Sequence, residues 1–259
     1  MPEILTWLWR DYPQPIKAGV APERRIDILI PGEEWQLVSG GHKFTEGPAV
    51  NAAGEVFFTD IPNSRIHKIA IDGTVSLFAE NTDKANGLMF GPDGKLYACA
   101  NGVKQIVRYD MTGQRETVVE EAECNDLVIL ADGSGYYTDP GNKKVWRFTA
   151  DGQKSLADEG IAKPNGIIVS PDQTLLNVAD TDGRFTWSFQ IQSDGTLAHK
   201  QTYGYLHVPD ETSQSGADGM TVDTEGRLYI TTRVGLQVLD QPGRVHLILS
   251  KPNSGWLSN

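Results

Sequence analysis

The sequence lacks an apolar run of the roughly 20 residues that a membrane-spanning helix needs. Its first residues, MPEILTWLWRDYPQPI, also lack the basic stretch followed by an apolar stretch that marks a secretory signal peptide. We therefore expect a cytoplasmic protein. Positive charge is in short supply, since 23 lysines and arginines accompany 34 acidic residues and the net charge is −11. Nucleic acid and anionic membrane surfaces would repel such a chain, so neither is expected as a partner.

Cysteine is scarce and helical periodicity is absent. The two cysteines, Cys99 and Cys124, have neither metal-ligand spacing nor the pattern of a disulfide framework. Cys99 lies inside the alternating run KLYACA, which predicts a buried free thiol. No useful stretch shows the 3.6-residue apolar period of an amphipathic helix, and the G-x-S-x-G elbow of serine hydrolases is missing. These absences point to an all-β protein without a serine-type catalytic centre.

An internal repeat runs along most of the chain. Five segments combine a turn with a β-rich run: NAAGEVFFTD, GPDGKLYACA, LADGSGYYTD, SPDQTLLNVAD and DTEGRLYITT. Each is followed by two more strand-like runs separated by a turn. Four short strands per repeat, at a period of about 40 residues, are typical of a β-propeller blade. We therefore predict an irregular N-terminal extension over residues 1–34 and an all-β propeller over residues 35–259.

The first strand of each repeat begins with an oxygen-bearing side chain. The five residues are Glu46, Asn86, Asn125, Asn165 and Asp218. The first strand of a blade lines the central channel, so these positions should meet at one end of it. A single Asn or Asp before Gly is ordinary turn chemistry. Five such positions in phase, none of them cationic, predict a ring of ligands for a hard divalent cation, with Ca²⁺ first and Zn²⁺, Mg²⁺ or Mn²⁺ as alternatives.

These residues also carry a family resemblance. The motifs FTEGPAV, NDLVI, KPNGIIVSPD and ADGMTVDTEGRLYIT resemble those of the senescence-marker-protein/gluconolactonase (regucalcin-like) family, from about residue 35 to the C-terminus. The resemblance implies a six-bladed propeller that binds a divalent cation in its channel and hydrolyses sugar lactones. It implies Glu46, Asn165 and Asp218 as metal ligands. Asn125 would complete the site or contact substrate, and Asn86 would line the substrate pocket.

The expected reaction follows from such a site. A divalent cation with an open position polarises a lactone carbonyl and stabilises the oxyanion. A ligand carboxylate would activate the water, and the resemblance gives this role of general base to Asp218. One alternative is a phosphotriesterase-like hydrolase, because the same cation would polarise P=O. Another is a propeller that binds a cation or ligand without catalysis, since the fold alone does not separate these functions. The sequence does not indicate an oligomeric state.

Two features depart from the family pattern. Glu123 stands two residues before Asn125, where some relatives carry an arginine, so the identity of the substrate stays open. Asn259 falls at the ring position of a sixth blade whose remaining strands are absent. We therefore expect the sixth blade to be incomplete, with EWQLVSGG as an outer strand.

Other recurring polar residues are given structural interpretations. Asp60, Asp139 and Asp180 end the second strands of their repeats and are expected to accept backbone N–H bonds. His42, four residues before Glu46, would reach the channel mouth in one interpretation, and we favour the other, a surface histidine.

Overall fold

The structure is a computed structural model that describes residues 28–258. The chain divides between Leu37 and Val38 into two units, and the propeller belongs to the second. The predicted extension over residues 1–34 lies almost entirely outside the described residues. Among residues 28–258 no helix is both long and apolar enough to cross a membrane.

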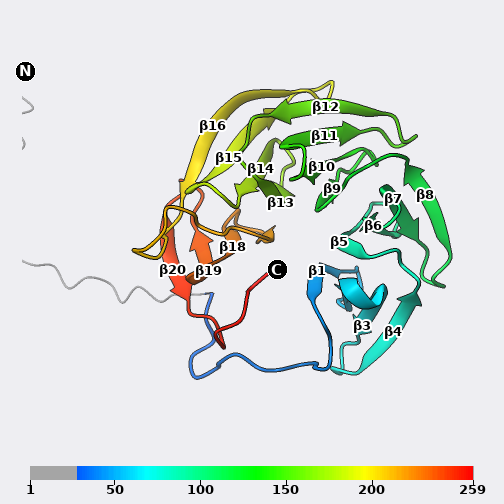
Figure 1. Cartoon of the computed structure of the whole chain (residues 1–259), viewed down its shortest axis with the longest axis horizontal. Helices are drawn as coiled ribbons and strands as arrows, with labels where there is room; N and C mark the ends of the chain where they lie inside the picture. Colours follow the sequence, from blue (N-terminus) through cyan, green and yellow to red (C-terminus); the bar gives the residue numbers. More distant parts are fainter. Residues whose placement is uncertain (1–27, 259) are drawn as a thin grey trace, which may run out of the picture. The chain divides into compact units, whose positions relative to one another are not determined.

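Within residues 28–258, twenty strands form five antiparallel sheets of four strands, in which each strand pairs with its neighbours in sequence. Blades 1 to 3 consist of β1 (Thr45–Val50), β2 (Val56–Asp60), β3 (Arg65–Ile69) and β4 (Val75–Glu80); β5 (Ala85–Phe90), β6 (Leu96–Ala100), β7 (Gln105–Tyr109) and β8 (Arg115–Val119); and β9 (Leu127–Ile129), β10 (Gly135–Asp139), β11 (Lys144–Phe148) and β12 (Lys154–Glu159). Blades 4 and 5 consist of β13 (Pro164–Val169), β14 (Leu175–Asp180), β15 (Phe185–Ile191) and β16 (Leu197–Tyr205); and β17 (Met220–Val222), β18 (Leu228–Thr232), β19 (Gly235–Leu239) and β20 (Val245–Leu249). A short 3₁₀ helix, η1 (Ile61–Asn63), joins β2 to β3. The sheets are arranged around a central axis, and β1, β5, β9 and β13 lie nearest to it in their blades (Figure 1). The prediction of an all-β propeller is confirmed.

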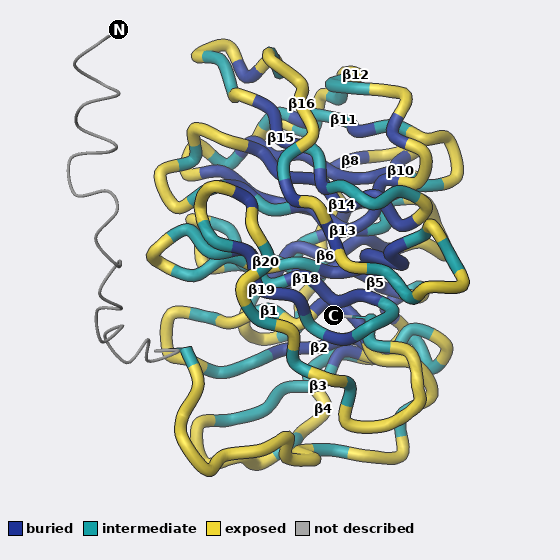
Figure 2. The backbone as a smooth tube through the Cα atoms, turned by 90° about the vertical axis from the view of Figure 1, so that its left-hand side faces the viewer, coloured by how far each residue is buried: buried dark blue, intermediate teal, exposed yellow. Residues whose placement is uncertain are grey.

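Burial falls from the second strand of each blade to the fourth. All five residues of β6 and of β10 are buried, whereas β4 and β12 contain no buried residue. Figure 2 shows the same gradient, with dark blue strands inside and yellow turns at the surface. A strand that is covered on both faces carries a continuous apolar run, which explains sequences such as LYACA in the second strands.

The apolar cores lie between neighbouring blades. Phe57 of blade 1 shares a buried cluster with Leu96 of blade 2, and Tyr136 of blade 3 shares one with Val178 of blade 4. All four side chains are completely buried. Each such side chain contributes about 1.5–3 kcal/mol through burial. Contacts between sheets therefore stabilise the propeller and fix the positions of the innermost strands.

The two cysteines form a disulfide, which the sequence analysis did not predict. Cys99 on β6 and Cys124, just before β9, are buried and their Cα atoms lie 5.2 Å apart. The prediction of a free thiol at Cys99 is wrong. Strand periodicity correctly placed Cys99 in a buried strand, but its partner is 25 residues away and comes close only when blades 2 and 3 pack together.

The sixth blade is not seen within residues 28–258, where the sheets number five. The segment EWQLVSGG contains no strand, and Asn259 lies outside the described residues. Residues near the C-terminus connect blade 5 to blade 1 instead. The Ser258 carbonyl accepts hydrogen bonds from Gly219 N–H (2.7 Å) and Thr231 Oγ1 (2.6 Å), and Ser258 Oγ donates to the Thr45 carbonyl (2.9 Å).

Candidate metal centre

The five predicted ring residues stand at the same end of the innermost strands. Glu46, Asn86 and Asn165 are the second residues of β1, β5 and β13, while Asn125 and Asp218 stand two residues before β9 and β17. Four of the five are buried, with exposures between 7% and 8%, and Asn125 is half-buried. Because every blade presents its first strand to the channel, each blade contributes one polar side chain to the same mouth.

Hydrogen bonds connect these side chains from blade to blade. Asn86 Nδ2 donates to Asn125 Oδ1 (2.7 Å), and Asn125 Nδ2 donates to Asn165 Oδ1 (2.5 Å). Asn165 also hydrogen-bonds Asp218, whose Oδ2 accepts a bond from the indole Nε1 of Trp256 (2.7 Å). The structure thus brings Asn86, Asn125, Asn165 and Asp218 together as the sequence analysis expected.

Glycine after the ring residue allows the blades to approach. A Cβ on Gly166 would lie 2.3 Å from the carbonyl oxygen of Asp218, and one on Gly87 would lie 2.9 Å from that of Asn125. The N–H of each glycine donates to the same carbonyl, at 2.9 Å and 3.0 Å. The Asn-Gly step at the start of these strands therefore meets a packing requirement, not the demand of a hairpin turn.

Glu46 is positioned by the same kind of contact. Gly47 has a φ of +54°, and a Cβ there would lie 2.6 Å from the carbonyl oxygen of Asn86. Thr59 Oγ1 on β2 donates to the Glu46 carbonyl at 3.0 Å. The hydrogen bond ties β1 to β2, while the close approach at Gly47 places β1 against β5, with Glu46 beside Asn86.

Blade 3 adds a carboxylate that the sequence analysis missed. Asp126 stands where glycine follows the ring residue in the other four blades, and it is only 8% exposed. Burial, and then the charge of Asp218, raise the pKa of Asp126 to about 7. Burial also raises the pKa of Asp218, against hydrogen bonds from Trp256 and Asn165 that lower it. The exception to the glycine pattern was visible in the sequence and could have revealed Asp126.

The donor set fits a hard divalent cation. Asp126 and Asp218 are neighbouring buried carboxylates, and Glu46 and the amide oxygens of three blades share their channel mouth. None of the five ring positions carries a basic side chain. Burying like charges together costs free energy, and a cation between them offsets that cost. Carboxylate and amide oxygens are the preferred ligands of Ca²⁺.

The acids that end the second strands have the structural partners that we predicted. Each accepts at least one backbone N–H bond: Asp60 from Lys43 and Phe44, Asp139 from Asn142, and Asp180 from Lys163. His42, which we expected at the surface, is mostly buried: its side chain is only 15% exposed, at the edge of a surface pocket, and its Nδ1 lies 3.6 Å from Asp60 Oδ2.

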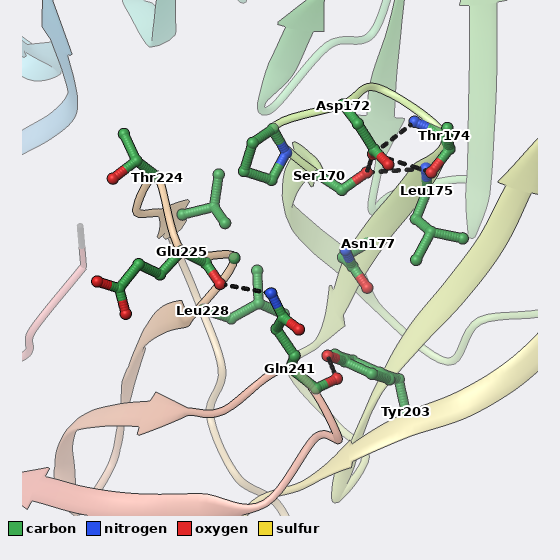
Figure 3. A pocket seen from close by; sticks show the side chains of 13 residues that line it. Ser170, Asp172, Thr174, Leu175, Asn177, Tyr203, Thr224, Glu225, Leu228 and Gln241 are labelled. Atoms are coloured by element: carbon green, nitrogen blue, oxygen red, sulfur yellow. Dashed lines mark hydrogen bonds between the residues drawn. The ribbon is translucent and has the colours of Figure 1, made fainter.

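A pocket of about 450 Å³ lies at the other ends of β13 and β17, between blades 4 and 5 (Figure 3). Asn165 and this pocket are separated by the length of β13, roughly 16 Å at the rise of a β-strand. The carboxylates at the pocket are bound in their own turns, Asp172 by Thr174 and Glu225 by Arg227. Asp126 and Asp218, the buried acids whose pKa values are raised, lie at the channel mouth, so we place the candidate centre there.

The fold and this site define a β-propeller with a ring of oxygen donors at one mouth of its channel. Comparison with known proteins identifies the family. The SMP-30/Gluconolactonase/LRE-like region matches residues 44–253, and the chain belongs to this family. The resemblance inferred from the four sequence motifs is confirmed.

Individual relatives share about a quarter of their residues with this chain. A gluconolactonase of Zymomonas mobilis is 27% identical, over 90% of this chain and 76% of its own. A diisopropyl-fluorophosphatase of Loligo vulgaris is 26% identical, over 78% of this chain and 72% of its own. The solved structure of a gluconolactonase from Xanthomonas campestris has a TM-score of 0.74 and 27% identity, and covers 84% of this chain and 79% of that one.

Proposed function

We propose that this chain is a divalent-metal-dependent hydrolase of sugar-type lactones. The observation that carries the proposal is the ring of buried oxygen donors, with two neighbouring carboxylates whose pKa values are raised by burial. The family, and the gluconolactonases that are 27% identical, support the substrate class.

Glu46, Asn165 and Asp218 are proposed to hold the cation, and Asn125 to complete or flank its coordination shell. We propose Ca²⁺ because every donor is an oxygen. Calcium–oxygen distances in proteins are roughly 2.3–2.6 Å, and a structure with the ion bound is expected to show them. Zn²⁺, Mg²⁺ and Mn²⁺ are the alternatives. When bound, the cation supplies Lewis acidity at the lactone carbonyl.

Asp218 is proposed as the general base. A carboxylate at the edge of the cation site is the available proton acceptor, and it is ionised when the cation is bound. The Trp256 indole holds Oδ2 and thereby orients the carboxylate. The water oxygen adds to the carbonyl carbon while its proton passes to Asp218. The ring C–O bond then breaks, the leaving oxygen takes up a proton, and an open-chain hydroxy acid results.

Asn86 and Asn125 are proposed to contact the substrate hydroxyls. Their amides lie in the hydrogen-bonded chain beside the proposed ligands. Glu123, which replaces the arginine of some relatives, forms an ion pair with Lys104 at 2.5 Å. An acceptor therefore stands where those relatives present a cationic donor, so the preferred sugar lactone is expected to differ from theirs.

A phosphotriesterase-like activity is the second candidate. The 26% identity to a diisopropyl-fluorophosphatase favours it. The same ring would serve, because a cation that polarises C=O also polarises P=O.

Three structural and cellular predictions remain proposals. The family resemblance implies six blades, and Ser258 supports this count because its backbone lies between β17 and β1, where a sixth innermost strand would run. The domain boundary at residues 34–35 is proposed on the repeat pattern. The cytoplasmic location stays a proposal, and the disulfide argues against it because such bonds are rare in the cytosol.

The test is hydrolysis of glucono-δ-lactone, measured by acid release, in chelator and after addition of Ca²⁺. We expect activity that disappears with chelator and returns with Ca²⁺. Diisopropyl fluorophosphate, assayed in parallel, separates the second candidate. If neither compound is hydrolysed in a metal-dependent way, a binding propeller replaces the enzyme.

A further inference from the structure

A second group of metal-ligating side chains lies outside the ring, in blade 1. His42, Asp60 and His67 place one ligand atom each within 4.8 Å of one another. His42 Nδ1 lies 3.6 Å from Asp60 Oδ2, and the centroids of the two imidazole rings are 4.7 Å apart. Zn²⁺ with ligands at about 2.0–2.1 Å in a tetrahedron separates the ligand atoms by roughly 3.4 Å. The widest separation in the cluster would need to shrink by at most about 1.4 Å to bind such an ion.

His67 departs from the pattern of the other blades. At the matching register, blades 3 and 4 carry Trp146 and Trp187, whose indole N–H groups donate to the strand-end acids Asp139 and Asp180 at 3.3 Å and 3.4 Å. His67 occupies this position on β3, opposite Phe58 of β2. Its Nε2 is buried and has no hydrogen-bond partner among residues 28–258. An imidazole that took the role of the indole would bond Asp60, but His67 Nε2 makes no such bond and is available to a metal ion in the tautomer that carries its proton on Nδ1.

The other two ligands are already oriented by neighbours. His42 Nε2 lies 2.7 Å from Ser39 Oγ, so this nitrogen can carry the proton while Nδ1 faces Asp60. Asp60 Oδ1 accepts the backbone N–H groups of Lys43 and Phe44, and Oδ2 accepts Asn63 Nδ2 at 2.7 Å. Hydrogen bonds of this kind hold the ligands of natural zinc sites in place.

We propose that His42, Asp60 and His67 form a second metal site, a three-ligand site for Zn²⁺. Two imidazoles and one carboxylate suit a borderline cation, in contrast to the all-oxygen ring. Asp60 pairs with Thr45 next to Glu46, but His67 lies two strands out, roughly 10 Å from β1. A surface pocket of about 270 Å³ that His42 helps to line gives the ion a route from solvent.

The site would fasten the segment before β1 to the outer strands of blade 1. His42 belongs to an irregular segment, while Asp60 ends β2 and His67 lies on β3. The same pocket is lined by Thr45, Trp256 and Ser258, which border the channel mouth. Zn²⁺ at this place would therefore stiffen one wall of the entrance to the ring.

The experiment is titration of the whole chain, stripped of metal, with Co²⁺ and with Zn²⁺ alone. We expect one Co²⁺ ion with the visible absorption of a tetrahedral nitrogen-oxygen site, displaced by Zn²⁺. His67→Trp introduces the residue that Trp146 and Trp187 provide at this register in blades 3 and 4. It should keep the fold and weaken Zn²⁺ binding by at least about 100-fold. Removal of an outer partner alone typically costs about 10–100-fold, the loss expected for Ser39→Ala.

His42→Ala, outside every strand, is the second test should His67→Trp unfold the blade. His199→Ala, at an exposed histidine, is the matched control and should bind Zn²⁺ like the parent chain. Glu46→Gln should weaken Ca²⁺ binding and leave the Co²⁺ spectrum intact. A tetrahedral Co²⁺ spectrum that survives both His42→Ala and His67→Trp, or that Glu46→Gln abolishes, would place the ion elsewhere and overturn the proposal, as would a parent chain that never shows this spectrum.

Discussion

Asp218 and Glu46 differ in that only Asp218 is proposed to move a proton. Asp218→Asn keeps an oxygen for the cation and removes the proton acceptor. Lactone hydrolysis should fall roughly 10²–10⁴-fold, the usual contribution of a positioned base. Ca²⁺ affinity, measured by calorimetry, should weaken less than activity.

Glu46→Gln is the matched comparison. It should require more Ca²⁺ and recover much of its activity when Ca²⁺ is in excess. If Asp218→Asn hydrolyses lactone as fast as the parent chain at saturating Ca²⁺, the base is another group.

Asp126 should make the stability of the metal-free protein depend on pH. Its pKa is raised from 3.8 to about 7, so over this interval the folded state keeps a proton that the unfolded state has released. By linkage, the stability that this proton confers on the folded state is fully present below pH 3.8 and is lost as the pH rises to about 7. The Asp126→Asn variant cannot ionise at this position, so its stability should fall less over this pH range. The smaller fall that remains is attributed to Asp218, whose pKa is also raised.

The measurement is the melting temperature in chelator as a function of pH. Asp172→Asn, a change at an exposed acid with a lowered pKa, should leave the decline in place. Ca²⁺ should flatten the curve of the parent chain, because a bound cation stabilises the charged carboxylates. A parent chain whose metal-free stability does not decline over this interval would show that Asp126 is ionised without cost.

At the scale of strands, the glycines that follow the ring residues determine how closely the blades pack. Gly166→Ala would bring a methyl group within 2.3 Å of the Asp218 carbonyl. We expect a loss of roughly 1–3 kcal/mol or more in unfolding free energy from overpacking. Ca²⁺ binding should weaken as well, because Asp218 shifts. Gly141→Ala is the control, since its nearest neighbour would be at 3.8 Å. Equal melting temperatures for the two variants would contradict this account.

The strands could be predicted from local periodicity. The ring positions could be predicted because aligning the five repeats puts these residues at the same place in each. The role of glycine could not, because the atoms that exclude a side chain at Gly166 belong to the next blade. The break in the glycine pattern at Asp126 could have been read from the sequence, but its raised pKa could not, because that depends in part on Asp218, 92 positions further along the chain. His67 resembled an ordinary strand residue until its register could be compared with that of Trp146 and Trp187.

At the scale of the whole molecule, the disulfide joins blade 2 to the segment that carries Asn125. Closing a separation of 25 residues stabilises a protein by roughly 3–4 kcal/mol in the loop-entropy account. The double change Cys99→Ala and Cys124→Ala should lower the melting temperature, and reductant should not lower it further. Alkylation of both cysteines in denatured protein without reductant would show that the bond is absent.

The number of blades also belongs to this scale. Sequence motifs and the family resemblance implied six, whereas residues 28–258 form five sheets. Periodicity identifies each blade separately, but the closure of a propeller depends on which segments meet across the ring. The hydrogen bonds from Ser258 to Thr45 and Gly219 connect positions that no local pattern relates.

The amide chain from Asn86 through Asn125 to Asn165 has a consequence for cooperativity. Repeat proteins are coupled mainly through nearest neighbours, so a terminal repeat can open while the others stay folded. Here the side chain of Asn125 is bonded at once to blade 2 and to blade 4. Opening of one blade therefore disturbs residues two blades away. We therefore expect blades 2, 3 and 4 to open more cooperatively than repeats that are joined only to their nearest neighbours.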